Sequence, residues 1–540
     1  MSLKQIETSG IERQHRRWLV RLILIVAACA QLSRLVQVQS ATGETPFLSA
    51  NDRSRWCTIA ALAVHGSYEI DDVIEIRDPE SRRRTWYTID LVQHRASDGK
   101  QHFYSSKPPL LPTILAGVYL AIRATTGATL MDDPFLVASV LLAIVNWVPL
   151  VAFWFLIARW IEQEDLDLWS SVVLACFLGW GTYLTTFVNT LNNHLPAAFA
   201  VGLSLWCIYQ VALKDDRRAW LFALCGICTS FGASNELPAL SWVAAAGAIL
   251  FFVDPKRTLV FYATSLLPVA LAFFAANYAA HGVWKPAYAH RSLGEKLGQV
   301  QIEAGQALES LPVAALRASL EELDIHASSA SMIRAARRAG YVEFWDPETQ
   351  LRLGVKPDTS DPSVLGIYVW DDWYDYPNSY WTDDRKQGVD RGEPSRSLYI
   401  FHCLFGHHGI ISLTPFWLVA IWGGVVVWRR RVAYNIFRDR QLLITAAIAA
   451  TTLVSIGFYL ARPLEDRNYG GVSSGFRWSF WLIPLWLWWV MRALPAIQHP
   501  IARRLVVVLL AISVFSSCFP WHNPWTSPWL MQLFEYLRLI

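Results

Sequence analysis

The sequence predicts an all-α polytopic membrane protein with about 11 transmembrane helices, additional interfacial helices and two large extracytoplasmic loops. Three observations carry this prediction. Only 17% of the 540 residues are charged and 54% are hydrophobic, whereas about a quarter of the residues in an average soluble chain are charged. Apolar runs of about 20 residues recur along the chain, and each is long enough to cross a hydrocarbon core of roughly 30 Å. Basic clusters recur in the connectors between these runs.

The first apolar run follows a basic N-terminus of residues 1–17. Val26–Cys29 within it resembles a lipoprotein cleavage box, but the apolar run continues past the box, so we expect an uncleaved first helix. The predicted spans are 18–36, 135–158, 168–188, 196–213, 219–235, 238–253, 258–280, 411–428, 441–461, 478–492 and 503–519.

The charge of the connectors predicts the orientation. If the runs cross the membrane alternately, the basic N-terminus and the basic connectors all lie on one side, which the positive-inside rule makes cytoplasmic. These connectors hold Lys214–Arg218, Asp254–Arg257, Arg429–Arg431, and Arg492 with Arg503 and Arg504. The connector Arg159–Asp167 is acidic and gives no support, although acidic residues count for little in this rule.

One further apolar segment, 108–122, would break the alternation if it crossed the membrane. It begins with two prolines and is short, so we interpret it as a helix at the outer interface. The N-terminus is then cytoplasmic and the C-terminus outside. Membrane regions 135–280 and 411–519 alternate with outer segments 37–134 and 281–410 and an outer tail, 520–540. We expect a multi-pass plasma or inner membrane protein whose chemistry faces the periplasm or outside.

The first outer segment holds three candidate site residues, Asp52, Arg55 and Lys107. Asp52 and Arg55 stand about one helical turn apart, followed by Trp56. A helix cap is the alternative role for Asp52. Lys107 directly precedes Pro108, at the depth of lipid phosphates, where a point charge suits a phosphate or pyrophosphate. The alternative is a lysine that only extends to lipid headgroups.

These residues and their placement resemble the GT-C superfamily of polyprenyl-phosphate-sugar-dependent glycosyltransferases. The acidic residue of Asp52-x-x-Arg55-Trp56 follows the first membrane helix, and Lys107-Pro108 precedes the next helix. The likeness is greatest to the branch of lipid A aminoarabinose transferases and protein O-mannosyltransferases. It covers the order of elements over residues 18–280, and the later segments more loosely. The Asp52–Lys107 spacing is longer than in the aminoarabinose transferases, and Ser106 stands where that branch can carry an acid.

The resemblance implies a sugar donor on a polyprenyl phosphate, a membrane lipid environment, and a lipid, glycan or protein acceptor. It makes Asp52 the base or the residue that positions the acceptor, and it makes Lys107 and Arg55 ligands of the donor phosphate. A nucleophile must lose a proton as it attacks C1, and cations must stabilise the leaving phosphate. We expect inversion at C1. The net charge of +3 argues against a nucleic-acid partner.

The second outer segment combines a stretch that we expect to be helical, 291–340, with an acidic and aromatic run. Trp370 and Tyr380 in this run suit sugar stacking, with membrane-interface aromatics as the alternative. Asp371 and Asp372 are weak candidates for a divalent metal, and no cofactor is otherwise expected.

Polar residues near the predicted outer ends of the spans complete the candidate set. His402, His407 and His408 suit substrate hydrogen bonding, and His407 and His408 are weak metal candidates. Arg467 and Arg477 flank a Gly-Gly loop and could clamp a phosphate; a plain loop is the alternative. The remaining substrate-binding candidates are Asn192, His194 and Glu236.

Two other functions compete with glycosyl transfer. A transporter or flippase of lipid-linked saccharides would show repeated halves and polar residues at the bilayer midplane. The sequence shows no internal repeat, and its polar residues gather at the outer ends of the spans. A non-catalytic membrane protein would leave these residues without a role.

Overall fold

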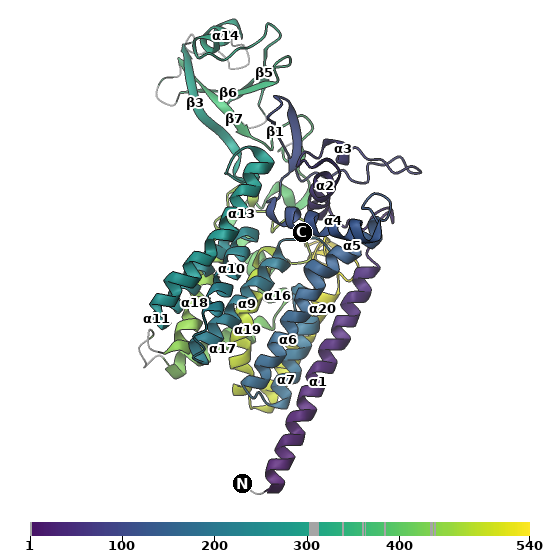
Figure 1. The fold of residues 1–540 in the computed structure, drawn as a ribbon, viewed down its shortest axis with the longest axis vertical. Coiled ribbons are helices and arrows are strands. Elements are labelled where there is room, and N and C mark those ends of the chain that lie inside the picture. Colours follow the sequence, from purple (N-terminus) through teal and green to yellow (C-terminus); the bar gives the residue numbers. More distant parts are fainter. Residues whose placement is uncertain are drawn as a thin grey trace. The chain divides into compact units, whose positions relative to one another are not determined.

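The computed structural model describes residues 3–301, 313–336, 340–358, 361, 363–382, 385–431, 436 and 439–539. The chain is mostly helical, and seven of its described helical segments are long and apolar enough to cross a membrane. It also contains a two-stranded and a five-stranded β-sheet, so an all-α class is too narrow (Figure 1). By contacts the chain divides into two units: Met1–Asp52 with Val118–Ala272 and Gly388–Ile540, and Arg53–Gly117 with Phe273–Gln387.

All eleven predicted spans coincide with helical segments. The seven long ones are Glu12–Val36 in α1 (Leu3–Val36), Pro134–Gln163 (α5 to α6), Leu168–Thr186 (α7 to α8), α9 (His194–Leu213), Pro255–His281 (α12 to α13), α18 (Arg440–Leu460) and α20 (Pro500–Cys518). The other four predicted spans correspond to α10 (Ala219–Asn235), η3 with α11 (Leu237–Val253), α16 with α17 (Ile410–Leu413, Trp417–Arg431) and η9 with α19 (Arg477–Leu482, Ile483–Ala493). These four are shorter, so the count of eleven stays a prediction. The segment predicted as interfacial forms α4 (Leu110–Thr126).

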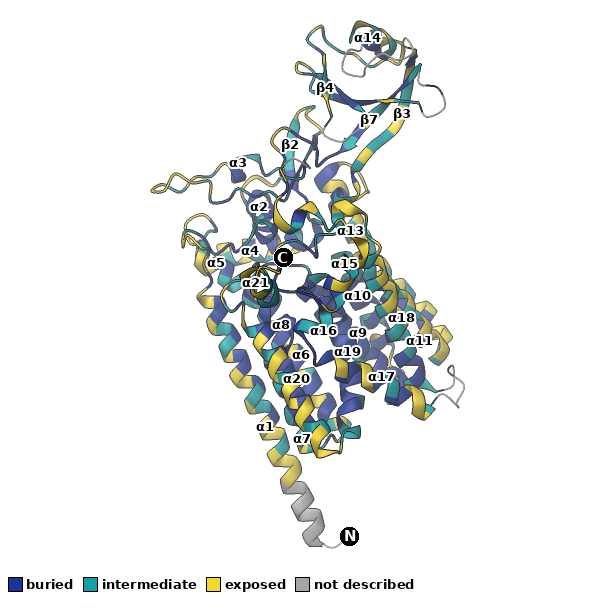
Figure 2. Ribbon diagram, turned by 180° about the vertical axis from the view of Figure 1, so that it is seen from behind, coloured by how far each residue is buried: buried dark blue, intermediate teal, exposed yellow. Residues whose placement is uncertain are grey.

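The helices of the first unit differ sharply in burial. In α9, 83% of the most apolar window is buried, against 22% in α20. Figure 2 shows the same contrast between the buried α9 and α19 and the exposed residues along α1, α11 and α20. The exposed residues of α20 include Ile501, Leu505 and Val508. Apolar side chains pointing away from the packed helices suit a hydrocarbon surrounding, because lipid rather than water then covers them.

The acidic connector after α6 (Val148–Gln163) pairs with basic residues at the ends of other helices. Arg16 of α1 lies 2.7 Å from Asp165, and Arg21 lies 3.1 Å from Glu162. Glu164 pairs with Arg492 and accepts a hydrogen bond from the Tyr209 hydroxyl at 2.6 Å. The acidic connector therefore lies with basic residues of α1 and of the end of α19.

The second unit contains both sheets. Strands β1 (Leu91–Arg95) and β2 (Gln101–Ser105) form an antiparallel pair. The larger sheet is antiparallel, with the order β3-β7-β6-β5-β4. Its strands are β3 (Arg291–Gln301), β4 (Met332–Ala335), β5 (Val342–Asp346), β6 (Leu351–Pro357) and β7 (Val364–Asp372). Leu316 and Leu320 of α14 (Val313–Glu322) pack in one core with Val300, Phe344 and Leu353.

The expectation that 291–340 is helical is therefore wrong for most of its described residues. Only α14 is helical, while β3 and β4 are strands; residues 302–312 and 337–339 lie outside the described part. Gly294 and Gly298 lower the helix propensity of this stretch, and antiparallel pairing of β3 with β7 favours the strand. The alternating residues Thr85–Ile89 do not form a strand, because β1 begins only at Leu91.

The connector ion pairs lead to a stability prediction. Glu164→Gln leaves the guanidinium of Arg492 without its carboxylate, and these side chains are 17% and 14% exposed. We expect the variant to lose about 3 kcal/mol of stability, the lower end of the cost of breaking a buried pair. Asp165→Asn is the matched control, because Asp165 is 58% exposed and should cost less than about 1 kcal/mol. Thermal unfolding of both purified variants in detergent checks this; equal losses would contradict the burial argument.

Candidate functional site

The candidate site of the first unit is built on an irregular segment, residues 187–193, between α8 (Tyr183–Thr186) and α9. Carbonyl groups that leave the helical hydrogen-bond pattern inside a membrane protein need other donors. The Asn146 side-chain amide donates to the carbonyls of Val188 and Thr190 at 3.0 and 2.8 Å. That of Asn192 donates to Phe187 and Thr190. The segment thus has a defined conformation held by two buried amides.

A buried arginine supports the same segment from α1. The Arg34 guanidinium donates to the carbonyls of Thr185, Thr186 and Trp521 at 2.8, 3.0 and 2.7 Å. The Asn189 amide donates to the His522 carbonyl at 3.0 Å. These contacts connect the end of α8 to the C-terminal tail.

Asp52 is fully buried at the beginning of α2 (Ala50–His65), where it completes a capping box. The Ser49 hydroxyl accepts from the backbone N–H of Asp52 at 3.2 Å, and the Asp52 carboxylate accepts from the Ser49 N–H at 2.9 Å. The other carboxylate oxygen accepts from the Leu48 N–H at 3.0 Å. The capping role weighed for Asp52 is therefore present, at the third helical position rather than at the N-cap.

Asp52 also contacts the irregular segment. The Thr190 hydroxyl donates to its carboxylate at 2.9 Å, and the indole N–H of Trp525 donates to the same hydroxyl at 2.7 Å. The Thr190 hydroxyl is thus oriented by a donor and an acceptor at once. This contact joins the first outer segment, the α8–α9 segment and the tail.

His194 forms the second half of the site with Glu236. Its Nδ1 is hydrogen-bonded to one carboxylate oxygen of Glu236, and both side chains are buried. The Asn193 amide donates to the same oxygen at 2.7 Å, and the Tyr459 hydroxyl donates to the other at 3.3 Å. Two of the predicted substrate-binding residues, His194 and Glu236, are therefore in direct contact.

Arg477 connects the two halves. Its Nη1 donates to Nε2 of His194 at 3.0 Å, and its guanidinium carbon lies 5.0 Å from the centre of the Trp525 ring. Its Nε donates to the Gly470 carbonyl. Gly470 has φ +94°, and a Cβ there would lie 3.1 Å from the Arg477 side chain, so a glycine permits this close approach. A continuous series of contacts now runs from Asp52 through Thr190, Trp525, Arg477 and His194 to Glu236 and Tyr459.

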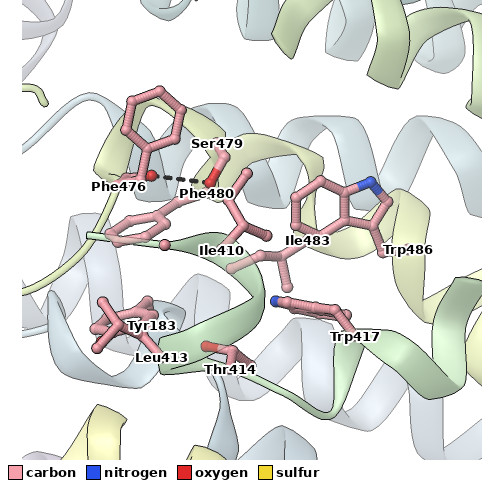
Figure 3. Close-up of a pocket in the computed structure, with 11 residues that line it drawn as sticks. Tyr183, Ile410, Leu413, Thr414, Trp417, Phe476, Ser479, Phe480, Ile483 and Trp486 are labelled. Atoms are coloured by element: carbon pink, nitrogen blue, oxygen red, sulfur yellow. Dashed lines mark hydrogen bonds between the residues drawn. The ribbon is translucent and has the colours of Figure 1, made fainter. Parts of the chain in front are cut away.

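An apolar pocket adjoins these contacts (Figure 3). The pocket is lined by Tyr183, Gly409, Ile410, Leu413, Thr414, Trp417, Phe476, Ser479, Phe480, Ile483 and Trp486. Phe476, Ser479 and Phe480 flank Arg477 in the chain. The Phe480 ring stacks on Tyr183 with centroids 5.1 Å apart and meets the His194 ring edge-on at 6.2 Å. The pocket wall is therefore shared with the polar site.

The three histidines of 402–408 form a separate buried cluster around Tyr469. His402 stacks on His407 with centroids 3.9 Å apart, and His408 stacks on Tyr469 at 4.7 Å. The Nδ1 atoms of His407 and His408 are hydrogen-bonded. Burial lowers the pKa of His407 to about 3 and lowers the pKa values of His402 and His408. The cluster is therefore neutral and packs against the loop that carries Gly470.

Arg467 anchors that loop rather than pointing to Arg477. Its guanidinium donates to the carbonyls of Arg462, Glu393 and Pro394 at 3.2, 3.3 and 3.1 Å. The side-chain oxygen of Asn192 accepts from the Leu195 N–H at 2.9 Å, and its side-chain amide donates to the Thr190 carbonyl of the α8–α9 segment. These two predicted ligands have structural contacts of their own.

The second unit holds the other predicted donor-binding residues. The Lys107 ammonium lies 3.0 Å from the buried carboxylate of Asp90. The backbone N–H of Lys107 donates to the Ser105 hydroxyl. Ser105 is hydrogen-bonded to Ser54, which donates to the Asp90 carbonyl. Lys107 is therefore in a defined pair with a carboxylate. Arg55 is buried on α2 of this unit, with 2% of its surface exposed.

The acidic and aromatic run offers little open surface for a sugar. Trp370 is buried under the Arg352 guanidinium, 4.3 Å from the ring centre, and Tyr380 meets Trp381 edge-on. Asp371 pairs with His290 and, at 2.7 Å, with Lys285. Asp372 is buried and accepts from the Tyr374 N–H at 3.3 Å. Within the described residues, no group of three or more His, Cys, Asp or Glu side chains is arranged to hold a metal ion.

Sequence reasoning missed four residues of these contacts: Thr190, Trp525, Tyr459 and Asp90. Thr190 lies inside the polar run that flagged Asn192 and His194, so local composition was the only available signal. The others come from distant segments, and no spacing relates them to their partners. Comparisons of the chain with protein-family models and with curated proteins find no match.

A histidine of the second unit gives a pH prediction. His94 is stacked between Tyr104 and Trp373, with centroids 4.2 and 4.1 Å away, and burial lowers its pKa to about 4. An unfolded histidine titrates near 6.5, so the unfolded state binds more protons between these values and stability falls as the pH falls from about 6.5 to about 4. The full loss is on the order of 3 kcal/mol. His94→Phe keeps the stacking, and we expect it to reduce the drop in melting temperature between pH 7 and pH 4.5.

His102→Gln is the control with the opposite sign. Burial lowers the pKa of His102, but the carboxylates of Asp98, Asp71 and Glu69 outweigh this and raise it. Its stabilisation is therefore present below the unfolded pKa and is lost as the pH rises through the folded pKa. The variant should lose more stability at pH 4.5 than at pH 7. A His94→Phe protein with an unchanged pH dependence would contradict the assignment.

Proposed function

We propose that this protein is an integral membrane glycosyltransferase of the GT-C type. It transfers a sugar from a polyprenyl-phosphate donor to a lipid, glycan or protein acceptor at the outer face of a plasma or inner membrane, with inversion at C1. The carrying observation is that Arg477, in contact with His194, stands beside an apolar pocket. A polyprenyl phosphate suits this arrangement, because a guanidinium binds an anionic phosphate and an apolar pocket suits an apolar chain.

The position of the site along the helices supports an outward-facing reaction. His194 and Glu236 stand at the end of α9 and α10 opposite to the connectors with Lys214 and Arg218. The span Glu12–Val36 of α1 has the same polarity. Arg16, near its beginning, pairs with Asp165 of the connector, and Arg34, near its end, donates to the Thr185 carbonyl beside the site. The 20 residues of α9 span about 30 Å, roughly the thickness of the hydrocarbon core.

The chemistry assigns the roles. The Arg477 guanidinium would pair bidentately with the donor phosphate and stabilise it as it leaves C1. The resemblance also makes Lys107, whose ammonium pairs with Asp90 in the second unit, a phosphate ligand. Asp52 would position the acceptor or take its proton, held by the capping box and by Thr190. Burial of these groups excludes water, which strengthens each electrostatic contact.

The proposal predicts loss of transfer in Asp52→Asn. Asparagine retains one acceptor oxygen, so the capping box should weaken by only about 1 kcal/mol. Transfer should fall about 100-fold or more, because the carboxylate charge is lost. The assay uses radiolabelled polyprenyl-phosphate hexoses and pentoses, purified protein and a membrane extract as acceptor, with Asp72→Asn on the exposed Asp72 as control. Undiminished transfer by Asp52→Asn in a folded protein would remove Asp52 from the reaction.

Arg477 gives a test of donor binding. Arg477→Ala removes a charge-assisted pair with the phosphate, so the donor KM should rise about 10- to 100-fold. Arg477→Lys keeps the charge but not the planar fork and should give an intermediate KM. Arg504→Ala, at the exposed Arg504 near the other end of the helices, is the matched control. Equal KM values for the Arg477 variants and the wild type would contradict a phosphate site here.

A further inference from the structure

The hydrogen bonds around His194 determine its protonation. Arginine can only donate, so the contact from Arg477 to Nε2 makes that nitrogen an acceptor. The ring proton must then lie on Nδ1, where it is donated to the Glu236 carboxylate. His194 is therefore a neutral imidazole whose Nε2 lone pair faces a guanidinium.

Glu236 holds the imidazole in this orientation. Its carboxylate also accepts from Asn193 and Tyr459, so its own position is fixed by α9 and α18. A carboxylate on Nδ1 fixes the tautomer and stabilises the imidazolium that forms when Nε2 takes a proton. Charged and titratable groups in contact with this pair include Arg477 from η9 and Tyr459 from α18.

Arg477 links the imidazole to anion binding. It shares one guanidinium between His194, the Gly470 carbonyl and the Trp525 face. A phosphate binds a guanidinium more strongly than a neutral nitrogen does, since its hydrogen bonds are assisted by opposite charges. An anion at Arg477 would therefore compete for the N–H that now occupies Nε2.

Asp52 differs from His194 in this respect. Its carboxylate oxygens accept from the backbone N–H groups of Leu48 and Ser49 and from Thr190. Hydrogen bonds to a carboxylate favour its ionised form and make it a weaker base. Backbone donors at a helix end stay in place when a substrate binds, whereas the Arg477 side chain can turn to a ligand.

We propose that His194, oriented by Glu236 and released by Arg477 when an anionic donor binds, accepts the proton of the incoming nucleophile. The inference rests on the proposed function and names the base of that reaction. As the acceptor oxygen or nitrogen forms its bond to C1, its proton passes to Nε2 of His194. The C1–O bond to the phosphate breaks, its electron pair stays on the phosphate oxygen, and Arg477 holds the resulting anion. Glu236 balances the imidazolium, and Asp52 is a positioning residue.

The test compares pH profiles of transfer in the full-length protein. We expect His194→Asn to lower kcat about 100-fold or more with little change in the donor KM, and to remove the fall in rate on the acidic side of the wild-type profile. Glu236→Gln should lower kcat and move that fall to lower pH, because the imidazolium loses its counter-charge. Imidazole in solution should restore part of the rate of His194→Gly. His65→Asn, at an exposed histidine of α2, should keep the wild-type profile.

The outcomes separate the inference from the proposed function. The acidic limb is the fall in rate on the acidic side of the pH profile. If the wild type transfers sugar and the folded His194→Asn protein keeps this acidic limb, the inference fails and the transferase proposal stands. If Asp52→Asn, and not His194→Asn, removes that limb, Asp52 is the base and the inference is wrong. If the wild type moves sugar from none of the polyprenyl-phosphate donors, even to water, both fail. Melting temperatures of all variants exclude misfolding as the cause, and imidazole rescue identifies the base even where the histidine also supports the fold.

Discussion

The candidate site depends on one constraint: the carbonyl groups of an irregular segment inside a helical membrane protein need donors. Between α8 and α9 the chain leaves helical geometry, and the amides of Asn146 and Asn192 supply the missing hydrogen bonds. Without them each buried carbonyl would cost several kcal/mol in a hydrocarbon surrounding. Because the segment is fixed, Thr190 reaches Asp52, and His194 begins α9 in register with Glu236. Residues without any reactive role thus determine where the reactive ones stand.

The same helices carry opposite kinds of polar contact at their two ends. At one end, Glu164 pairs with Arg492, and Asp165 with Arg16. At the other, buried hydrogen bonds connect neutral and charged groups around His194. Asp165 is exposed, which limits the desolvation cost of its pair with Arg16, whereas the Glu164–Arg492 pair is largely buried. A buried polar network is costly unless all its members are paired, so its presence at the other end argues for a selected function rather than for stability alone.

Hydropathy and charge were sufficient to locate the helices, because a long apolar segment has few alternatives in a membrane. They also flagged His194, Glu236 and Arg477 one by one, as polar residues next to apolar runs. They could not pair them, since the contact between His194 and Arg477 joins positions separated by 283 residues. In the second unit, β3 was missed because its partner β7 lies far along the chain, whereas β4 pairs with the nearby β5. Local composition therefore predicts the helices, whereas the grouping of the candidate site residues depends on contacts between distant parts of the chain.

The resemblance and the geometry rank the two candidate bases differently. A carboxylate in the Asp-x-x-Arg setting points to Asp52, yet the structure shows Asp52 completing a helix cap with backbone donors. A residue in such a cap supports the fold whether or not it reacts, so the cap contacts by themselves assign Asp52 no reactive role. The imidazole of His194 has an acceptor nitrogen whose partner is a cation, and a cation is what a phosphate donor attracts. Proton transfer from the acceptor would then begin only when the leaving group is in place. Under the proposed function, that order would keep the donor unreacted until acceptor and leaving group are both in place.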